Sequence, residues 1–135
     1  IKPIMKSEFF LRLPSEDAGP DDAATGQDLL DTLHEHEHEC VGLAANMIGV
    51  RKRIVCVKDG NRVLLMYNPQ ILEQVNAYQT SEGCLSLTGE RPCTRYRRIK
   101  VEYLDENFVH RIKNFSGYTA EIIQHEIDHC NGIVI

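Results

Sequence analysis

The chain has 135 residues, of which 42% are hydrophobic and 26% charged, and its formal net charge at pH 7 is −5. This length fits one compact domain spanning residues 1–135, and the apolar fraction is too high for a disordered chain. The acidic excess argues against a general nucleic-acid binder, and no apolar run approaches the ~18 residues that a membrane span needs. Charged residues interrupt the apolar ones over residues 1–13, unlike in a signal peptide, so we expect a soluble, cytoplasmic protein.

The cysteines are spread along the chain without a CxxC pair, at Cys40, Cys56, Cys84, Cys93 and Cys130. An odd, widely spaced set is not typical of a secreted disulfide scaffold. We therefore expect reduced thiols. Most of them should be small core residues, while at least one needs a different explanation.

The first half of the chain predicts an extended arm, one helix and three strands. Turn-forming proline, serine and glycine residues close the arm, and an apolar stripe of Leu29, Leu30 and Leu33 predicts the helix. The pair Asn68-Pro69 should stop the second strand, because proline cannot donate a hydrogen bond to a sheet. The expected ranges are 1–20 for the arm, 21–39 for the helix, and 54–57, 63–67 and 71–75 for the strands.

The second half predicts a hairpin and then the clearest helix of the chain. Strand-forming residues indicate strands over 99–104 and 108–112. An apolar face at three- and four-residue spacing predicts a helix over about 119–130, through Ala120, Ile123, Ile127 and Cys130. Strands first and a late helix, without βαβ alternation, indicate an α+β fold. Mostly antiparallel sheets should pack around this C-terminal helix, with another helix near the N-terminus.

The last helix carries the motif HExxH, formed by His125, Glu126 and His129. Residues four apart share one helix face, so both imidazoles can bind one metal ion while the glutamate lies beside its bound water as a proton acceptor. The alternative is a surface helix that happens to hold two histidines. The apolar residues of the helix favour the metal site, because they occupy the opposite face.

A hydrolytic metal site needs three protein ligands and an open position for water. After His129 the sequence offers only Cys130, which points off the other face of the helix, so the third ligand is expected upstream. The best candidate is Cys84 in the segment EGCLS, where Gly83 lets the backbone approach closely. A Cys/His/His set suits Zn and Fe(II) alike.

Three segments together resemble the motifs of the peptide deformylases in order and rough spacing: residues 41–45, 82–86 and 124–129 read VGLAA, EGCLS and QHEIDH. The resemblance implies a metal-dependent hydrolase of protein biosynthesis. Its substrates would be nascent or short N-formylated peptides, from whose N-terminal methionine it removes the formyl group. The resemblance also implies one divalent metal ion, usually Fe(II), with Zn or Ni as substitutes.

The same resemblance assigns roles to single residues. The metal ligands would be Cys84, His125 and His129. The catalytic groups would be Glu126, as general base and acid, and the backbone N–H of Leu85, facing the developing oxyanion. The substrate contacts would be Gly42, Met47 and Arg95.

The first motif departs from the family pattern Gly-x-Gly-x-Ala-Ala-x-Gln at two positions. Cys40 replaces the first glycine, for which the sequence offers no reason, and Met47 replaces the glutamine. The glutamine amide donates a hydrogen bond to the oxyanion. A thioether cannot, and losing one such donor typically costs ~10²–10³ in turnover. The neighbouring Asn46 would point about 100° away on a helix and is shorter, so we expect deformylation with reduced efficiency.

Two other functions stay open. One is a deformylase-like amidase for another acylated substrate, which tolerates or prefers Met47 in the pocket. The other is a non-catalytic, metal-containing protein that binds N-terminal methionine or formyl peptides. The presence of Glu126 argues against a pure binder, because binding alone has no need for a base beside the water.

Two charged clusters fall outside the motifs. Histidines alternate with glutamates over residues 34–39, as His34, His36 and His38, and we expect a solvated helix end there. A basic cluster comprises Arg91, Arg95, Arg97, Arg98 and Lys100. Alternation along a strand would split it between two faces, which predicts a solvated surface plus the functional Arg95. The alternative is a patch that faces the ribosome.

Overall fold

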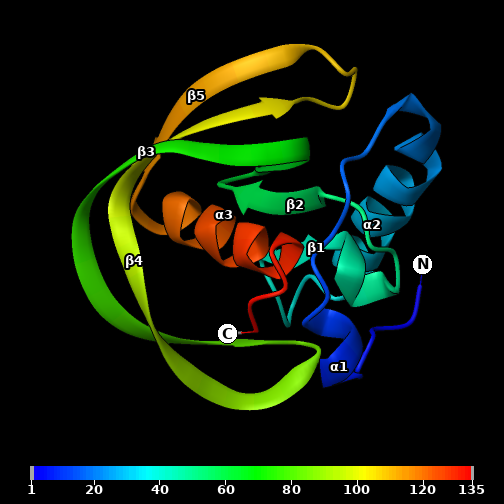
Figure 1. Cartoon of the computed structure of the whole chain (residues 1–135), viewed down its shortest axis with the longest axis horizontal. Coiled ribbons are helices and arrows are strands. Elements are labelled where there is room, and N and C mark those ends of the chain that lie inside the picture. The colour runs from blue at the N-terminus through cyan, green and yellow to red at the C-terminus, as the bar shows by residue number, and fades with distance from the viewer. Residues whose placement is uncertain (1, 135) are drawn as a thin grey trace.

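The computed structural model describes residues 2–134, and an antiparallel sheet forms its centre. Within these residues the strands are β1 (Gly42–Ala44), β2 (Ile54–Asp59), β3 (Arg62–Cys84), β4 (Leu87–Leu104) and β5 (His110–Ser116). They pair in chain order, and every pair is antiparallel. Figure 1 shows β3 and β4 as long strands that curve around the last helix.

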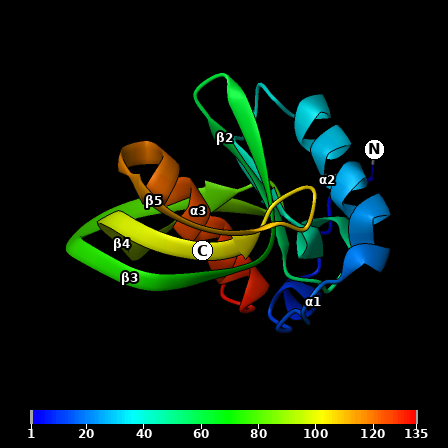
Figure 2. The same ribbon diagram turned by 90° about the horizontal axis from the view of Figure 1, so that it is seen from above.

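Helices cover both faces of the short strands. The last helix, α3 (Gly117–Cys130), packs against β1 and β2 from inside the curve of β3 and β4. The helix α2 (Ala23–Glu35) packs on the other side of β1 and β2 (Figure 2). Three short helices complete the described chain: α1 (Glu8–Leu11), η1 (Pro20–Asp22) and η2 (Ala45–Ile48). The expected α+β fold is confirmed, and no helix within residues 2–134 is long and apolar enough to cross a membrane.

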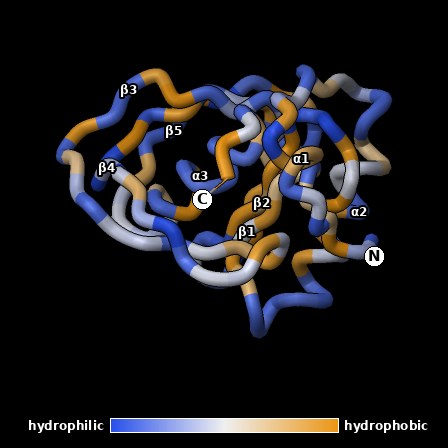
Figure 3. The backbone as a smooth tube through the Cα atoms, turned by 60° about the horizontal axis from the view of Figure 1, so that its bottom comes forward, coloured by the Kyte–Doolittle hydropathy of each residue, from blue (hydrophilic) through white to orange (hydrophobic). Residues whose placement is uncertain are grey.

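The hydrophobic core is densest where β2 runs between the two helices. The side chains of Ile54, Val55, Cys56 and Val57 are all fully buried. Successive side chains of a strand point to opposite faces, so a strand buried along its whole length must be covered on both sides. The hydrophobic backbone at the centre of Figure 3 follows β1 and β2.

The expectation that Asn68-Pro69 ends a strand is wrong, because β3 continues through it to Cys84. Asn68 has a left-handed backbone with φ of 54°, and the pairing with β4 shifts between Tyr67 and Gln70. The proline therefore lies at a bulge, where it need not donate a ladder hydrogen bond. The Asn68 side chain binds the backbone N–H and carbonyl of Ala18, at 2.7 and 2.9 Å.

Other element boundaries also differ from the expectation. The helix α1 forms inside the expected arm, where the Ser7 side chain accepts a hydrogen bond from the Phe10 N–H as an N-cap. The helix α2 ends at Glu35 rather than at residue 39, because the residues that follow offer no apolar side chains to bury. The strand β4 begins at Leu87, well before the expected residue 99, and most side chains of its first half are exposed.

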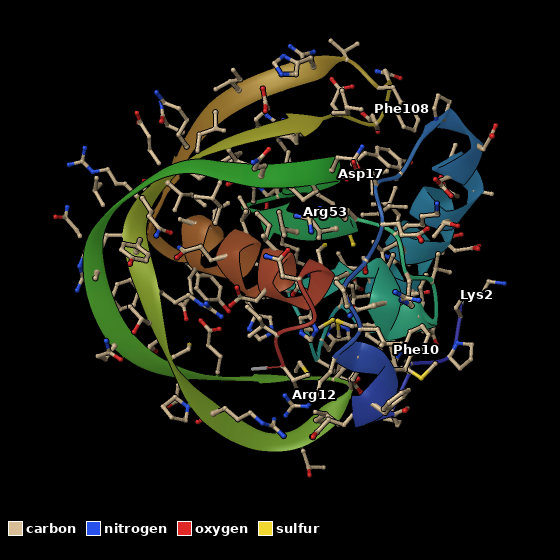
Figure 4. All side chains as sticks on the ribbon, viewed as in Figure 1. Lys2, Phe10, Arg12, Asp17, Arg53 and Phe108 are labelled. Atoms are coloured by element: carbon tan, nitrogen blue, oxygen red, sulfur yellow. The ribbon has the colours of Figure 1, made fainter. Side chains whose placement is uncertain are left out.

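Two residues labelled in Figure 4, Phe108 and Arg53, make contacts that connect these elements. Phe108, in the turn before β5, stacks on Tyr67 with 4.2 Å between ring centroids. Arg53 donates hydrogen bonds to Asn131 Oδ1 at 2.8 Å and to the carbonyl of Pro69 at 3.0 Å. Arg53 thereby links the residue that follows α3 to the bulge of β3.

Candidate active site

The helix α3 brings His125 and His129 together. Their Nε2 atoms are 3.3 Å apart, and both side chains are buried. Gln124, beside them, faces β4 instead: its amide accepts a hydrogen bond from the Tyr96 N–H and donates one to the Tyr96 carbonyl, both at 2.8 Å. The glutamine thus pairs with the strand as a neighbouring strand would, and fixes the rotation of α3 against it.

Glu82 on β3 orients His125. Its Oε1 is 2.7 Å from His125 Nδ1, which places the imidazole proton on Nδ1 and leaves the Nε2 lone pair free. Burial alone would raise the pKa of Glu82, but hydrogen bonds from His125 and Arg95 lower it well below its usual range. Burial likewise opposes protonation of His125, yet the bond to Glu82 and the charge of Glu126 raise its pKa overall.

Arg95 on β4 joins this pair to the helix. Its guanidinium donates to Glu82 Oε1 at 2.7 Å and to Asp128 Oδ2 at 2.7 Å. Arg95 is 4% exposed and does not line the cavity described below. The sequence predicted a substrate contact for this residue; the structure places it behind the site, where it links β3, β4 and α3.

Glu126 is a buried carboxyl with a free oxygen. It is 4% exposed, and its Oε1 has no hydrogen-bond partner in the described structure. Burial raises its pKa to about 7, although the neighbouring His125 opposes the shift. Gly42 makes room for it, because a Cβ at that position would lie 3.0 Å from Glu126 Oε2 and 2.7 Å from an Ile122 methyl.

His129 is held in the neutral form that binds metals. Burial, followed by the charge of His125, lowers its pKa to about 3. Its Nδ1 is buried and has no partner within the described residues. Two facing imidazole nitrogens and a carboxyl beside them match the donor chemistry of a divalent-ion site.

Cys84 lies at the end of β3, on the wall of the same cavity as His125. The strand pairing shifts between Glu82 and Cys84, so the ladder is irregular just before the cysteine. Across residues 2–134, no three potential ligands lie close enough together to hold one ion. The structure thus brings the two histidines together and places Cys84 on the wall of the cavity that His125 also lines.

A cavity of about 630 Å³ opens over these residues. It is lined by residues 37–42 and Met47, by 81–85 with Leu87 and Gly89, and by Tyr118, Glu121, Ile122, His125 and Glu126. The predicted residues Gly42, Met47, Cys84, Leu85, His125 and Glu126 therefore share one cavity.

Met47 is 1% exposed and forms part of the cavity wall. The neighbouring Asn46 does not replace a missing amide donor there. Its Nδ2 donates to the His129 carbonyl at 2.9 Å and to the Leu11 carbonyl at 3.4 Å. The side chain of Asn46 is engaged in holding the end of α3 against α1.

The functional residues that sequence reasoning missed are Glu82, Gln124 and Asp128, all inside or next to the recognised motifs. A carboxylate two residues from a proposed ligand was a signal for Glu82, since metal-bound histidines usually donate their second N–H to such a group. The histidines of residues 34–38 pair with glutamates, as His34 with Glu37 at 3.3 Å. Residues 37–39 also reach the mouth of the cavity.

Comparison with known proteins identifies the family. The sequence model of a family described as Polypeptide deformylase matches residues 5–135. The chain belongs to the peptide deformylase family. A peptide deformylase from Clostridium beijerinckii is 51% identical over 135 residues, covering 100% of this chain and 99% of that one. Peptide deformylase 1 from Clostridium perfringens is 38% identical over 111 residues, covering 80% of this chain and 74% of its own.

Solved structures of the family share the fold. The deformylase from Thermus thermophilus matches with a TM-score of 0.87 and 34% identity, covering 99% of this chain and 83% of that one. A class I type b deformylase from Acinetobacter baumannii, bound to actinonin, matches with a TM-score of 0.88 and 30% identity, covering 99% and 94%. This family member is therefore a hydrolase of the deformylase type.

Proposed function

We propose that this chain removes the formyl group from N-formylmethionyl peptides, with a lower turnover than deformylases that carry glutamine at the position of Met47. The observation that carries the proposal is Glu126, a buried carboxyl beside two facing histidines, with one free oxygen. A base with a pKa near 7 is well suited to accept and return a proton at neutral pH. A deformylase structure of similar fold contains Met-Ala-Ser, which supports a peptide with N-terminal methionine as the occupant of this cavity.

The metal would be held by Cys84, His125 and His129, with Fe(II) as the native ion and Zn or Ni as substitutes. When bound, such an ion lowers the pKa of a coordinated water toward ~7 and polarises a carbonyl oxygen. Glu82 serves this site by keeping the proton of His125 on Nδ1, and Arg95 keeps Glu82 in place. These two residues therefore act as positioning residues.

The residues of this chain carry the proton transfers. Glu126 takes a proton from the attacking water at Oε1, as the water oxygen bonds to the formyl carbon. The backbone N–H of Leu85 donates a hydrogen bond to the formyl oxygen as it gains negative charge. Glu126 then returns the proton to the nitrogen while the C–N bond breaks, and formate and the free amine leave.

Two further functions are weighed against this one, because Met47 adds an apolar group to the cavity wall. The first is hydrolysis of another acylated amine, one that presents no carbonyl oxygen to the Met47 side chain. The second is binding of N-terminal methionine or formyl peptides without turnover. In each case the same residues would hold the metal.

We further propose that the protein acts in the cytoplasm on nascent chains. The basic residues of β4 would form either a solvated surface or a patch that faces the ribosome, and Arg97 and Arg98 among them are exposed. Arg97 lies over the ring of Tyr78 at 4.6 Å, and Arg95 is buried, so only part of that cluster is free for a partner.

The test is a deformylation assay with anaerobically prepared Fe(II) protein on formyl-Met-Ala-Ser. We expect release of formate, and in Glu126→Gln we expect unchanged metal content with activity lower by ~10²–10⁴, the usual contribution of a positioned base. Acetyl-Met-Ala-Ser serves as the competing substrate. Equal activity of the unmodified protein and Glu126→Gln would mean that the reaction takes place at another site. Release of acetate alone would favour the other amidase, and binding without hydrolysis would favour the binder.

A further inference from the structure

The turn between β3 and β4 carries the backbone N–H on which the proposed reaction depends. Cys84 pairs with Leu87 across the two strands, so Leu85 and Ser86 form a two-residue turn. The N–H and carbonyl groups of such turn residues lie outside the hydrogen-bonded ladder of the strands. The N–H of Leu85 is therefore free to face a substrate, whereas its carbonyl needs a partner from another part of the chain.

The conformation of this turn is not the one that the twist of the strands favours. The favoured two-residue turns, types I′ and II′, need a positive φ at the first turn residue or at both. The described residues with positive φ do not include Leu85 or Ser86, and the strand pairing shifts between Glu82 and Cys84. The side-chain oxygen of Ser86 is buried without a hydrogen-bond partner among the described residues. The turn accordingly depends on support from outside the hairpin.

Residues 2–8, which we call the N-terminal strap, supply this support. The strap first reaches η2, where the Met5 N–H donates a hydrogen bond to the Met47 carbonyl at 2.7 Å. The next residue, Lys6, donates from Nζ to the carbonyl of Leu85. Figure 1 shows α1, which follows directly, beside the turn. One short segment thus contacts both η2 and the β3–β4 turn, which lie on two walls of the cavity.

The residues around Lys6 hold its backbone in place. Ser7 caps α1, and Leu11 in that helix is fully buried. Glu8, in the first turn of α1, forms an ion pair with Arg91 of β4 at 4.0 Å. Because the chain is anchored on both sides of Lys6, its ammonium group reaches the turn without a large loss of backbone entropy.

We propose that Lys6 positions the oxyanion donor by holding the carbonyl of Leu85. The inference rests on the proposed function, to which it adds a positioning residue. The carbonyl and the N–H belong to the same residue, so fixing one limits the rotation of the other. Lys6 is not among the residues that line the cavity, so it acts through Leu85 rather than on the substrate. Its effect should grow as the formyl oxygen gains negative charge.

The kinetic test replaces Lys6 in the Fe(II)-loaded protein, with formyl-Met-Ala-Ser as substrate. Lys6→Met should lower kcat by about threefold to tenfold, the usual effect of losing one hydrogen bond. KM should stay unchanged, because the donor acts mainly in the transition state. Lys6→Arg keeps a charged donor and should restore kcat to within about twofold of the unmodified protein.

Hydrogen exchange examines the turn independently of turnover. In Lys6→Met the backbone amides of residues 86–88 should exchange at least about threefold faster, whereas those of β2 should keep their rates. Lys6→Arg should again resemble the unmodified protein. If the unmodified protein released no formate, the proposed function would fail. The exchange rates would still decide whether Lys6 holds the turn.

Lys2→Met is the matched control, because it removes the same charge from the same strap. Lys2 Nζ lies 3.9 Å from Asp28 of α2, so this variant should keep both kcat and the exchange rates of the turn. An unchanged kcat in active, fully metallated Lys6→Met, or unchanged exchange over residues 86–88, would overturn the proposal. Loss of metal from Lys6→Met would also overturn it, since the turn would then act through Cys84.

Discussion

At the scale of single residues, Met47 and Cys40, the two positions at which the first motif departs from the expected pattern, both line the cavity. Met47 is buried in the wall, and Asn46 beside it is committed to the carbonyls of His129 and Leu11. No amide from this segment is therefore free to meet the formyl oxygen. Leu85 N–H would act without a side-chain donor from η2.

Met47→Gln should restore such a donor. The gain should appear mainly in kcat, because the hydrogen bond strengthens as negative charge develops in the transition state. We expect kcat to rise at least tenfold. The upper limit is about 3–4 kcal/mol of transition-state stabilisation, the inverse of deleting an oxyanion donor. Met47→Leu keeps the volume without an amide and should not gain. A folded, fully metallated Met47→Gln protein without any rise would favour a different acyl substrate or a binding role.

Cys84→Ser should lose most of the bound metal, because a hydroxyl is a poor replacement for a thiolate. Metal content per chain, measured by atomic emission after dialysis, is the readout. The double variant His34→Ala, His38→Ala is the control: both histidines are exposed and pair with Glu37, and their removal should leave the stoichiometry unchanged. Full metal content in Cys84→Ser would remove the cysteine from the site.

At the scale of elements, the turn between β4 and β5 shows how one carboxylate organises a hairpin. Asp105 Oδ1 accepts hydrogen bonds from the Asn107 and Val109 N–H groups at 2.9 and 3.0 Å, and Oδ2 accepts one from Arg111 at 2.9 Å. The bond from Val109, then that from Arg111, lowers the pKa of Asp105 below 3.8. The charged form is therefore the one that the folded turn stabilises.

Asp105→Asn should lower Tm at pH 7 by a few degrees. A carboxyl with a depressed folded pKa contributes its stability above the unfolded pKa of 3.8 and loses it as the pH falls through the folded pKa. The Tm values of the two proteins should thus converge as the pH falls below about 3.8. Glu106→Gln in the same turn controls for net charge. A constant difference in Tm at every pH would contradict the linkage.

Elements with strong local signals could be predicted from the sequence. The helix α3 combines an apolar periodicity with a motif, and its range is nearly that expected. The single long β3 could not be predicted, because a proline usually ends a strand. At Pro69 the strand continues only through a bulge, which the hydrogen bond between Asn68 and Ala18 supports. The first half of β4 is largely exposed and carries no hydrophobic alternation to find.

For the candidate site too, contacts within one element could be predicted from the sequence, whereas contacts between distant elements could not. The spacing of His125 and His129 indicated that they would meet, since one helix holds both. The partners of Arg95 could not be read from the sequence, because they come from β3 and α3 and meet only after the hairpin has wrapped the helix. For the same reason a substrate contact was expected of Arg95, although its guanidinium is fully engaged behind the cavity.

At the scale of the whole molecule, Arg95 is the charged link between the curved hairpin and α3. Its side chain is 5% exposed, and those of Glu82 and Asp128 are 9% and 23% exposed. Removing one member of a buried ionic cluster leaves uncompensated charges away from water.

Arg95→Met should therefore destabilise the protein by about 3 kcal/mol, seen as a lower midpoint in urea unfolding. Arg98→Met, on the exposed side of the same strand, is the matched control and should change stability by less than about 0.5 kcal/mol. Equal urea midpoints for Arg95→Met and Arg98→Met would show that the ionic cluster does not stabilise the whole fold.

The order of the elements along the chain also determines when the site comes into existence. Gly42 in β1 and Glu126 in α3 are neighbours in space, yet β2 to β5 lie between them in the sequence. Contacts of such long range form late and slowly in folding. A growing chain that still lacks α3, or an intermediate with α3 undocked, has no floor for the cavity. Metal uptake would then stabilise only the finished protein, so the number of bound ions would count the molecules that have completed folding.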